Sequence, residues 1–392
     1  MKKFLFIITY FIILNSFSQS KIEIGEKHSL FSTVLNENRA YWIYLPPNYN
    51  DTIYAPETYP VVYFLDGDRH FHSLTGIQDF LSVGPYASLP NMIYVGILTS
   101  ENRSRDLTPT NVNKPQTNKG FVFPNTGGND QFLEFIASEL MPEINKKYRT
   151  NGYKTLIGHS FGGLTVFNTL FTKPNLFNAY IAIDPSVWWD DEYILNKVRT
   201  ELDGLNLKGK RLYIAQANNI PTSEDSDRTH ENAIITLKKE LEKHTNSELK
   251  WSFCFFEEDD HGTIPLPSEY FGLRYVFEGY QLDAKMVAAH PELLVEIFDE
   301  FKNNIGYKFN PDEARIDDIA QFCAQTDRPK KAIQLFKINQ DYYPNSINTY
   351  VSLGDFYTEI SDFDNAKKEY QKALKLKPTS KLVLKKLNTL NK

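Results

Sequence analysis

Apolar residues in this chain fall into short continuous runs that alternate with segments of helical period. The runs are Pro60–Leu65, Asn91–Leu98, Thr155–Ile157, Ala179–Ile183, Lys210–Gln216 and Trp251–Phe256. Such runs are typical of strands buried on both faces of a parallel sheet. Residues 21–46 instead alternate roughly between apolar and polar positions, which predicts two or three antiparallel strands at one edge of the same sheet.

The segments between the runs carry the helical signal. Apolar residues recur with helical spacing in 77–83, 132–148, 164–171 and 230–244. Strands that alternate with helices predict an α/β fold, a mostly parallel sheet with helices on both faces, which we assign to residues 21–282. Active sites in such folds lie beyond the carboxyl ends of the strands.

From residue 283 onward the pattern is helical only. We expect 283–310 to form a helical linker and 311–392 to form a small all-α domain of tetratricopeptide repeats. Ala332, Phe336 and Pro344 recur as Ala366, Tyr370 and Pro378, at the spacing of about 34 residues typical of these repeats. The second unit also carries the repeat's other marker positions: Tyr350, Leu353, Gly354, Tyr357 and Ala373.

The first 18 residues have the features of a cleavable signal peptide. Lys2 and Lys3 precede an apolar run from Phe4 to Leu14, and Ser16-Phe17-Ser18 provides a small-x-small cleavage site. The run is too short to span a membrane comfortably. We therefore predict an exported bacterial protein, secreted or periplasmic, without a membrane span.

Composition narrows the function. A hydrophobic content of 41% indicates a well-filled core, and the net charge of −6 makes nucleic acid an improbable partner. Cys254 and Cys323 fall in different expected domains, so no disulfide framework or Cys/His metal spacing is present in the sequence. We expect neither a metal nor an organic cofactor.

The motif that carries chemistry is Gly158-His159-Ser160-Phe161-Gly162, between a strand and a helix. This context is that of a nucleophile elbow, in which a sharp turn lifts the serine hydroxyl above the sheet. Gly158 and Gly162 are expected to remove side chains that would clash there. We predict Ser160 as the nucleophile and the N–H of Phe161 as an oxyanion donor.

A serine nucleophile needs a base within hydrogen-bond reach. His261 follows the last strand, so it lies at the same edge of the sheet as Ser160, and we predict it as that base. The other histidines considered fit less well, because they lie within the elbow, near the early loop, or on or beside the helix before the last strand: His159, His70, His72, His230 and His244.

The chain resembles the putative esterase family of α/β-hydrolases, which includes enterochelin esterases, S-formylglutathione hydrolases and feruloyl esterases. The resemblance covers about 22–280. It rests on Glu37-Asn38-Arg39, Tyr44-Leu45-Pro46, Tyr63–Gly67, Gly158–Gly163, Asp184-Pro185-Ser186-Val187-Trp188-Trp189 and Asp260-His261-Gly262. It implies a serine esterase, and the chain looks like a variant of the family that is a periplasmic bacterial hydrolase with C-terminal tetratricopeptide repeats.

The resemblance also implies an acid after the strand 210–216, but the residues there are Ala217-Asn218-Asn219. The carboxylates that follow are Glu224, Asp225, Asp227 and Glu231. We favour Asp225, with Glu224 as the alternative. A Ser–His dyad steadied by a backbone carbonyl or by one of the carboxylates in Glu257–Asp260 is a second possibility.

Three further roles are expected near the carboxyl edge of the sheet. The second oxyanion donor is expected to be the N–H of Asp68, because its loop follows the strand beside the elbow. Trp188 and Trp189 are expected to line a substrate pocket or, equally, to form a packed lid. An arginine within Asn102–Asp106 is expected to form a local ion pair or to meet an anionic substrate.

Two functions of different classes remain. The first is an exported serine esterase that acts through an acyl-enzyme on a siderophore lactone, on feruloyl or acetyl groups of a polysaccharide, or on a similar ester. The second is a hydrolase-fold scaffold, catalytically weak or inactive, that binds a protein partner through its repeats.

Overall fold

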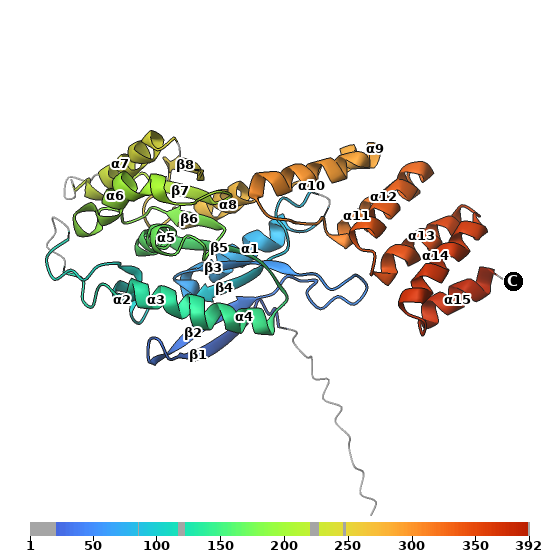
Figure 1. The fold of residues 1–392 in the computed structure, drawn as a ribbon, viewed down its shortest axis with the longest axis horizontal. Helices are drawn as coiled ribbons and strands as arrows, with labels where there is room; N and C mark the ends of the chain where they lie inside the picture. Colours follow the sequence, from blue (N-terminus) through green and yellow to red (C-terminus); the bar gives the residue numbers. More distant parts are fainter. Residues whose placement is uncertain (1–20, 85, 117–121, 220–226, 246–247, 391–392) are drawn as a thin grey trace, which may run out of the picture.

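A sheet of eight strands forms the centre of the larger domain (Figure 1). The computed structural model describes residues 21–390 except 85, 117–121, 220–226 and 246–247. The strand order is β1-β2-β4-β3-β5-β6-β7-β8, antiparallel at β1, β2 and β4 and parallel from β4 to β8. The strands are β1 (Glu26–Ser32), β2 (Glu37–Tyr44), β3 (Tyr59–Phe64), β4 (Ile93–Ile97), β5 (Thr150–His159), β6 (Ala179–Ile183), β7 (Arg211–Ala217) and β8 (Lys250–Phe256). The predicted α/β-hydrolase fold, with antiparallel strands at one edge, is confirmed.

Helices cover both faces of this sheet. Side chains of α1 (Gly67–Leu81) and α8 (Pro265–Val276) pack on one face. The other face is covered by α3 (Asn129–Phe135), α4 (Met141–Lys147), α5 (Phe161–Thr172), α6 (Trp189–Glu201) and α7 (Thr229–Lys243). The short helix α2 (Arg103–Leu107) follows β4.

Two helices differ from the expected segments. α1 begins at Gly67, directly after β3, rather than near residue 77, so the amides of its first turn lie at the carboxyl edge of the sheet. The expected helix 132–148 is interrupted by a π-helical turn over Ile136–Leu140. Pro142 follows that turn, and a proline has no N–H for the regular helical hydrogen bond.

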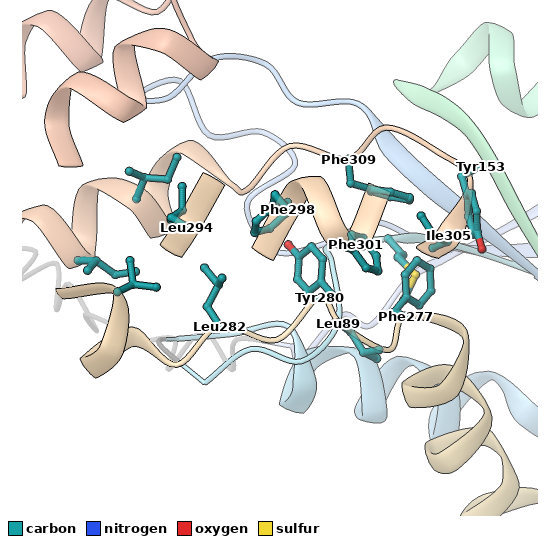
Figure 2. Packing of buried hydrophobic residues seen from close by; sticks show 14 of the residues in the cluster. Leu89, Tyr153, Phe277, Tyr280, Leu282, Leu294, Phe298, Phe301, Ile305 and Phe309 are labelled. Atoms are coloured by element: carbon teal, nitrogen blue, oxygen red, sulfur yellow. The ribbon is translucent and has the colours of Figure 1, made fainter. Parts of the chain in front are cut away.

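The predicted linker is part of the hydrophobic core. It contains α9 (Ala284–Ala289) and α10 (Glu292–Ile305). Leu294, Phe298, Phe301 and Ile305 of α10 are buried, and Figure 2 shows this row beside Tyr280, Phe277 and Phe309. Burial of each such side chain contributes about 1.5–3 kcal/mol. Because α9 contacts α10, α11 and α12, the two linker helices together join the C-terminal helices to the core beside the sheet.

The C-terminal domain consists of paired helices, which Figure 1 shows beyond α10. They are α11 (Glu313–Gln325), α12 (Pro329–Tyr342), α13 (Ile347–Glu359), α14 (Phe363–Leu376) and α15 (Lys381–Leu390). Gly354 allows α13 to approach Tyr370 of α14, because a Cβ at this position would lie 2.6 Å from the ring. Within the described part of the chain, no helix has the length and apolarity needed to cross a membrane.

Candidate active site

Ser160 lies on a strained turn between β5 and α5. Its φ of 61° and ψ of −116° fall outside the regions that side chains favour. The turn is held by its own backbone, since Ser160 N–H donates to the carbonyl of Ile183 (3.0 Å) and Ser186 N–H donates to the carbonyl of Ser160 (3.1 Å). Such strain, kept by surrounding hydrogen bonds, is characteristic of functional sites.

The glycines of the elbow have different steric roles from those expected. A Cβ on Gly158 would lie 2.3 Å from the backbone of Gly162, and a Cβ on Gly163 would lie 2.8 Å from Pro185. A Cβ on Gly162 would meet only Leu65 at 3.5 Å, an ordinary contact distance. The tight turn therefore requires Gly158 and Gly163, whereas the expected clash at Gly162 is absent.

His261 follows β8 and turns its ring toward Asp184. Its Nδ1 lies 2.6 Å from Asp184 Oδ2, and the side chain of Asp184 is fully buried while that of His261 is 42% exposed. Asp184 follows β6, the strand beside the elbow strand, and has a φ of 39°. The second carboxylate oxygen, Oδ1, accepts the N–H of Ala217 at 3.0 Å.

The contacts of Asp184 keep it ionised. Burial opposes its charge, but hydrogen bonds from His230 and His261 outweigh burial and hold the pKa of this carboxyl well below its usual value. A buried carboxylate on Nδ1 directs the lone pair of Nε2 outward, which is the form required of a general base.

The carboxylates favoured from the sequence are not placed by this structure. Asp225 and Glu224 lie outside the described residues. Glu231 is buried near Arg228 at 3.8 Å, and Asp227 accepts the N–H of Thr229 at the start of α7. The group that meets His261 is Asp184, which the sequence analysis treated only as part of a family motif.

The asparagines after β7, where the resemblance implied an acid, bind the backbone of the His261 loop. Asn219 Oδ1 accepts the backbone N–H of His261 at 2.9 Å, and Asn218 Nδ2 donates to the carbonyl of Glu257 at 2.9 Å. The loop after β7 therefore holds the histidine loop in place. Asp260 accepts the N–H groups of Gly262 and Thr263 within its own turn.

His230, which the sequence analysis set aside, is a second histidine on Asp184. Its Nε2 lies 2.9 Å from Asp184 Oδ2, and its Nδ1 accepts the indole N–H of Trp188 at 2.8 Å. An indole N–H only donates, so the ring proton of His230 stands on Nε2. A carboxylate at the end of a buried strand next to the elbow strand was the available sequence signal for Asp184. No comparable signal identified His230.

Ligand atoms of Asp184, His230 and His261 lie within 4.8 Å of one another, a spacing that suits a metal ion. A metal on His230 would have to bind Nε2 through a lone pair. The Trp188 hydrogen bond places the proton on that same atom. The donor set therefore fits a hydrogen-bonded proton network better than a metal centre.

The hydroxyl of Ser160 lies 3.3 Å from that of Ser186. No hydrogen bond joins Ser160 to the ring of His261 among the described residues. Hydrogen bonds between nucleophile and base often tighten only in the substrate complex. Both groups follow the carboxyl ends of strands at the same edge of the sheet, Ser160 after β5 and His261 after β8, as the sequence predicted.

His159 lies beside the site with its ring 4.5 Å from that of His261. Burial, reinforced by the nearby His261 and His70, lowers the pKa of His159 to about 3. His159 is therefore neutral across the physiological range and adds no positive charge next to the base.

Two helix N-termini meet at the elbow. Phe161 and Asp68 occupy the first turns of α5 and α1, where N–H groups lack helical acceptors. The two turns are neighbours, because a Cβ on Gly162 would lie 3.5 Å from Leu65 and 4.0 Å from Asp66. The side chain of Asp68 is exposed. This arrangement suits an oxyanion hole made of backbone N–H groups.

The two tryptophans differ in exposure. Trp188 is partly buried and bonds His230, whereas Trp189 is fully buried with its N–H on Thr110 at 2.9 Å. Trp189 also packs against Phe161. Of the two expectations, the burial of Trp189 favours the packed arrangement, because its side chain is part of the core.

The arginines after β4 are committed to ion pairs. Arg103 makes two hydrogen bonds of 2.9 Å to Asp66, and Arg105 binds Glu37 and Asp106. The local ion pair, rather than a free anion site, is the arrangement that the structure shows.

The family model described as "Putative esterase" matches residues 32–261, and a tetratricopeptide-repeat model matches 347–380. The ferri-bacillibactin esterase BesA of Bacillus subtilis is 32% identical over 239 residues, which cover 58% of this chain and 82% of that protein.

Solved structures agree with this relationship. An IroE-like serine hydrolase from Shewanella oneidensis is 30% identical with a TM-score of 0.73, over 81% of this chain and 99% of that one. An uncharacterised protein from Capnocytophaga ochracea is 17% identical with a TM-score of 0.61 over 94% of this chain and 99% of that one. The second likeness shows that the fold is shared along nearly the whole chain.

Proposed function

Since the chain belongs to the "Putative esterase" family and is an esterase with the α/β-hydrolase fold, we propose that it hydrolyses ester bonds of a siderophore through an acyl-enzyme. The observation that carries the choice of substrate is the similarity to BesA over 82% of that protein's length. The similarity to the IroE-like hydrolase supports a serine-type mechanism.

In this mechanism Ser160 Oγ attacks the ester carbonyl carbon while its proton passes to Nε2 of His261. The N–H groups of Phe161 and Asp68 hold the oxyanion. Collapse breaks the bond to the alcohol, which takes the proton from His261. A water molecule, deprotonated by the same histidine, then releases the acid and frees Ser160. Asp184 stabilises the imidazolium in both halves of the cycle.

The substrate class is tested by steady-state kinetics with ferri-bacillibactin, iron-free bacillibactin, methyl ferulate, acetylated xylan and p-nitrophenyl acetate. We expect kcat/KM for a siderophore lactone to exceed that for the small esters by about 100-fold, because remote contacts contribute to transition-state binding. A higher value for methyl ferulate or acetylated xylan would overturn the siderophore assignment and leave the esterase chemistry intact.

The acyl-enzyme route is tested with a fluorophosphonate probe. Active protein is expected to be labelled at Ser160, and Ser160→Ala is expected to lose both labelling and turnover. A matched Ser186→Ala variant keeps the nucleophile and is expected to be labelled. Turnover by Ser160→Ala at the unaltered rate would end the proposal.

We also propose that the protein is exported and that residues 1–18, outside the described residues, are removed. Lys2-Lys3, the apolar run and the small residues near Ser18 support this. Expression of the full chain in a bacterium, followed by fractionation and N-terminal sequencing, tests it. Full-length protein retained in the cytoplasm would contradict export.

The tetratricopeptide repeat at 347–380 supports binding of a protein partner as an additional role. The residues Ala217-Asn218-Asn219, where the resemblance implies an acid, would favour an inactive scaffold if His261 had no other carboxylate. Asp184 supplies a carboxylate to His261, so this reason for the scaffold no longer holds.

A further inference from the structure

His230 connects α7 to the carboxylate of Asp184. It receives the indole N–H of Trp188 on Nδ1 and faces Asp184 Oδ2 with Nε2. His261 bonds the same oxygen. Oδ2 of Asp184 therefore lies within hydrogen-bond distance of two histidine rings, while Oδ1 accepts the N–H of Ala217.

The two histidines lie on different elements and approach Asp184 from different sides. Their ring centroids are 5.1 Å apart at an interplanar angle of 86°. His230 lies in the first turn of α7 and accepts the Trp188 N–H, whereas His261 lies in the loop after β8 and is more exposed. His230 is thus the partner held on both ring nitrogens, and His261 is the one more open to solvent.

We infer that His230 is a positioning residue that sets both the orientation of Asp184 and the share of its negative charge available to His261. This inference rests on the proposed function of Ser160 and His261. A donor on Oδ2 stabilises the carboxylate independently of His261, so it weakens the attraction between the carboxylate and an imidazolium at His261. Without this donor the imidazolium form is stabilised, and the free base is available only at higher pH.

Other charged and titratable groups around His261 do not substitute for His230. His159 from β5 is neutral, for the reason given above. His70 of α1 is paired with the buried Glu269 of α8, with 2.6 Å between His70 Nδ1 and Glu269 Oε1. In its own loop, Asp260 is engaged by backbone N–H groups, and Arg103 after β4 is paired with Asp66.

Two substitutions of matched polarity separate positioning from simple packing. In His230→Gln the amide nitrogen reaches the place of Nε2 and still donates to Asp184. In His230→Asn the shorter amide reaches only the place of Nδ1, so it meets Trp188 and leaves Asp184 without its donor. Both variants are amides in the same position, and their melting temperatures are measured as a check of folding.

The readouts are the pH dependence of kcat/KM for p-nitrophenyl acetate and the rate of fluorophosphonate labelling of Ser160. In His230→Asn we expect the pH at which both rates fall on the acidic side to rise by about one unit, with an approximately tenfold loss of each rate at pH 6. In His230→Gln the acidic side of both pH profiles is expected to match that of the unaltered protein.

The inference would be overturned if the acidic side of the pH profiles were the same in His230→Asn, His230→Gln and the unaltered protein. An equal shift in both variants would also overturn it. Failure of the proposed function would look different, because Ser160→Ala would then retain turnover. If Ser160→Ala is inactive and the limbs do not move, only the role of His230 is refuted.

Discussion

Replacement of Asp184 by asparagine tests which carboxylate completes the site. In the folded protein Oδ1 of Asp184 accepts one N–H, from Ala217, and Oδ2 faces two histidines. An amide has only one oxygen. With its nitrogen at the Oδ2 position it confronts two ring N–H donors, and with its nitrogen at the Oδ1 position it confronts the N–H of Ala217.

The size of the effect follows from the tautomer of His261. With an amide N–H opposite Nδ1, the ring must accept there and carry its proton on Nε2, where it cannot act as a base. Amide replacement of a triad carboxylate lowers kcat by about 10⁴-fold in the well-studied serine protease case. We expect a loss of about 10³–10⁴-fold here, or about 4–5.5 kcal/mol of transition-state stabilisation.

The assay is initial-rate hydrolysis of p-nitrophenyl acetate at pH 7.5 by the unaltered protein and three variants. Asp184→Asn is compared with Asp225→Asn and Glu224→Gln, the carboxylates favoured from the sequence. The latter two are expected to stay within about threefold of the unaltered rate, because Nδ1 of His261 is already engaged by Asp184. Thermal melting establishes that Asp184→Asn is folded at the assay temperature.

The reasoning is refuted if folded Asp184→Asn keeps more than about a tenth of the activity. A loss of about 10³-fold in Asp225→Asn or Glu224→Gln instead would place the acid in the loop after β7. Equal small losses in all three variants would favour the Ser–His dyad.

Three further outcomes are expected. Gly158→Ala should abolish fluorophosphonate labelling while Gly162→Ala keeps it, because a Cβ clashes at 2.3 Å in the first and only meets a side chain at 3.5 Å in the second. Gly354→Ala should lower the melting temperature by an amount corresponding to about 1–3 kcal/mol, since its Cβ would lie 2.6 Å from the ring of Tyr370; an unchanged or higher melting temperature, as helix propensity alone predicts, would contradict this. Burial and two neighbouring carboxylates raise the pKa of Glu57 to about 8. Between about pH 4.5 and pH 8 the folded chain therefore keeps a proton on Glu57 that the unfolded chain releases. The free energy of unfolding accordingly falls as pH rises from about 4.5 to about 8. Glu57→Gln should therefore melt above the unaltered protein at pH 8.5 and together with it at pH 4, and equal melting at both pH values would refute the shift.

The order of strands and helices was predictable because each element has its own local pattern. Continuous apolar runs such as Tyr59–Phe64 form the buried parallel strands, and β1 and β2 form the expected antiparallel edge. The repeat at 347–380 was also predictable, since its small and aromatic residues recur at fixed spacing. The extent of α1 was not, because its first half carries few apolar positions.

The site residues also divide into those that the local sequence predicts and those that it does not. Ser160 and its turn are encoded within a few residues, because the glycines and the flanking strand and helix are contiguous. His261 was inferred from its place after the last strand. Asp184 also follows a buried strand, but several carboxylates lie at this edge of the sheet, and the sequence does not tell which of them meets the ring of His261.

The sequence by itself therefore determined the fold class, the nucleophile turn and the repeat domain, all of which depend on local periodicity and steric demand. Only the tertiary structure decided that Asp184 meets His261 and His230, and that α9 and α10 join the two domains through one core. Side-chain hydrogen bonds depend on the register of neighbouring strands and on the path of the loops that follow them. In this protein the pairing of β6, β7 and β8 brings the two histidines to one buried carboxylate.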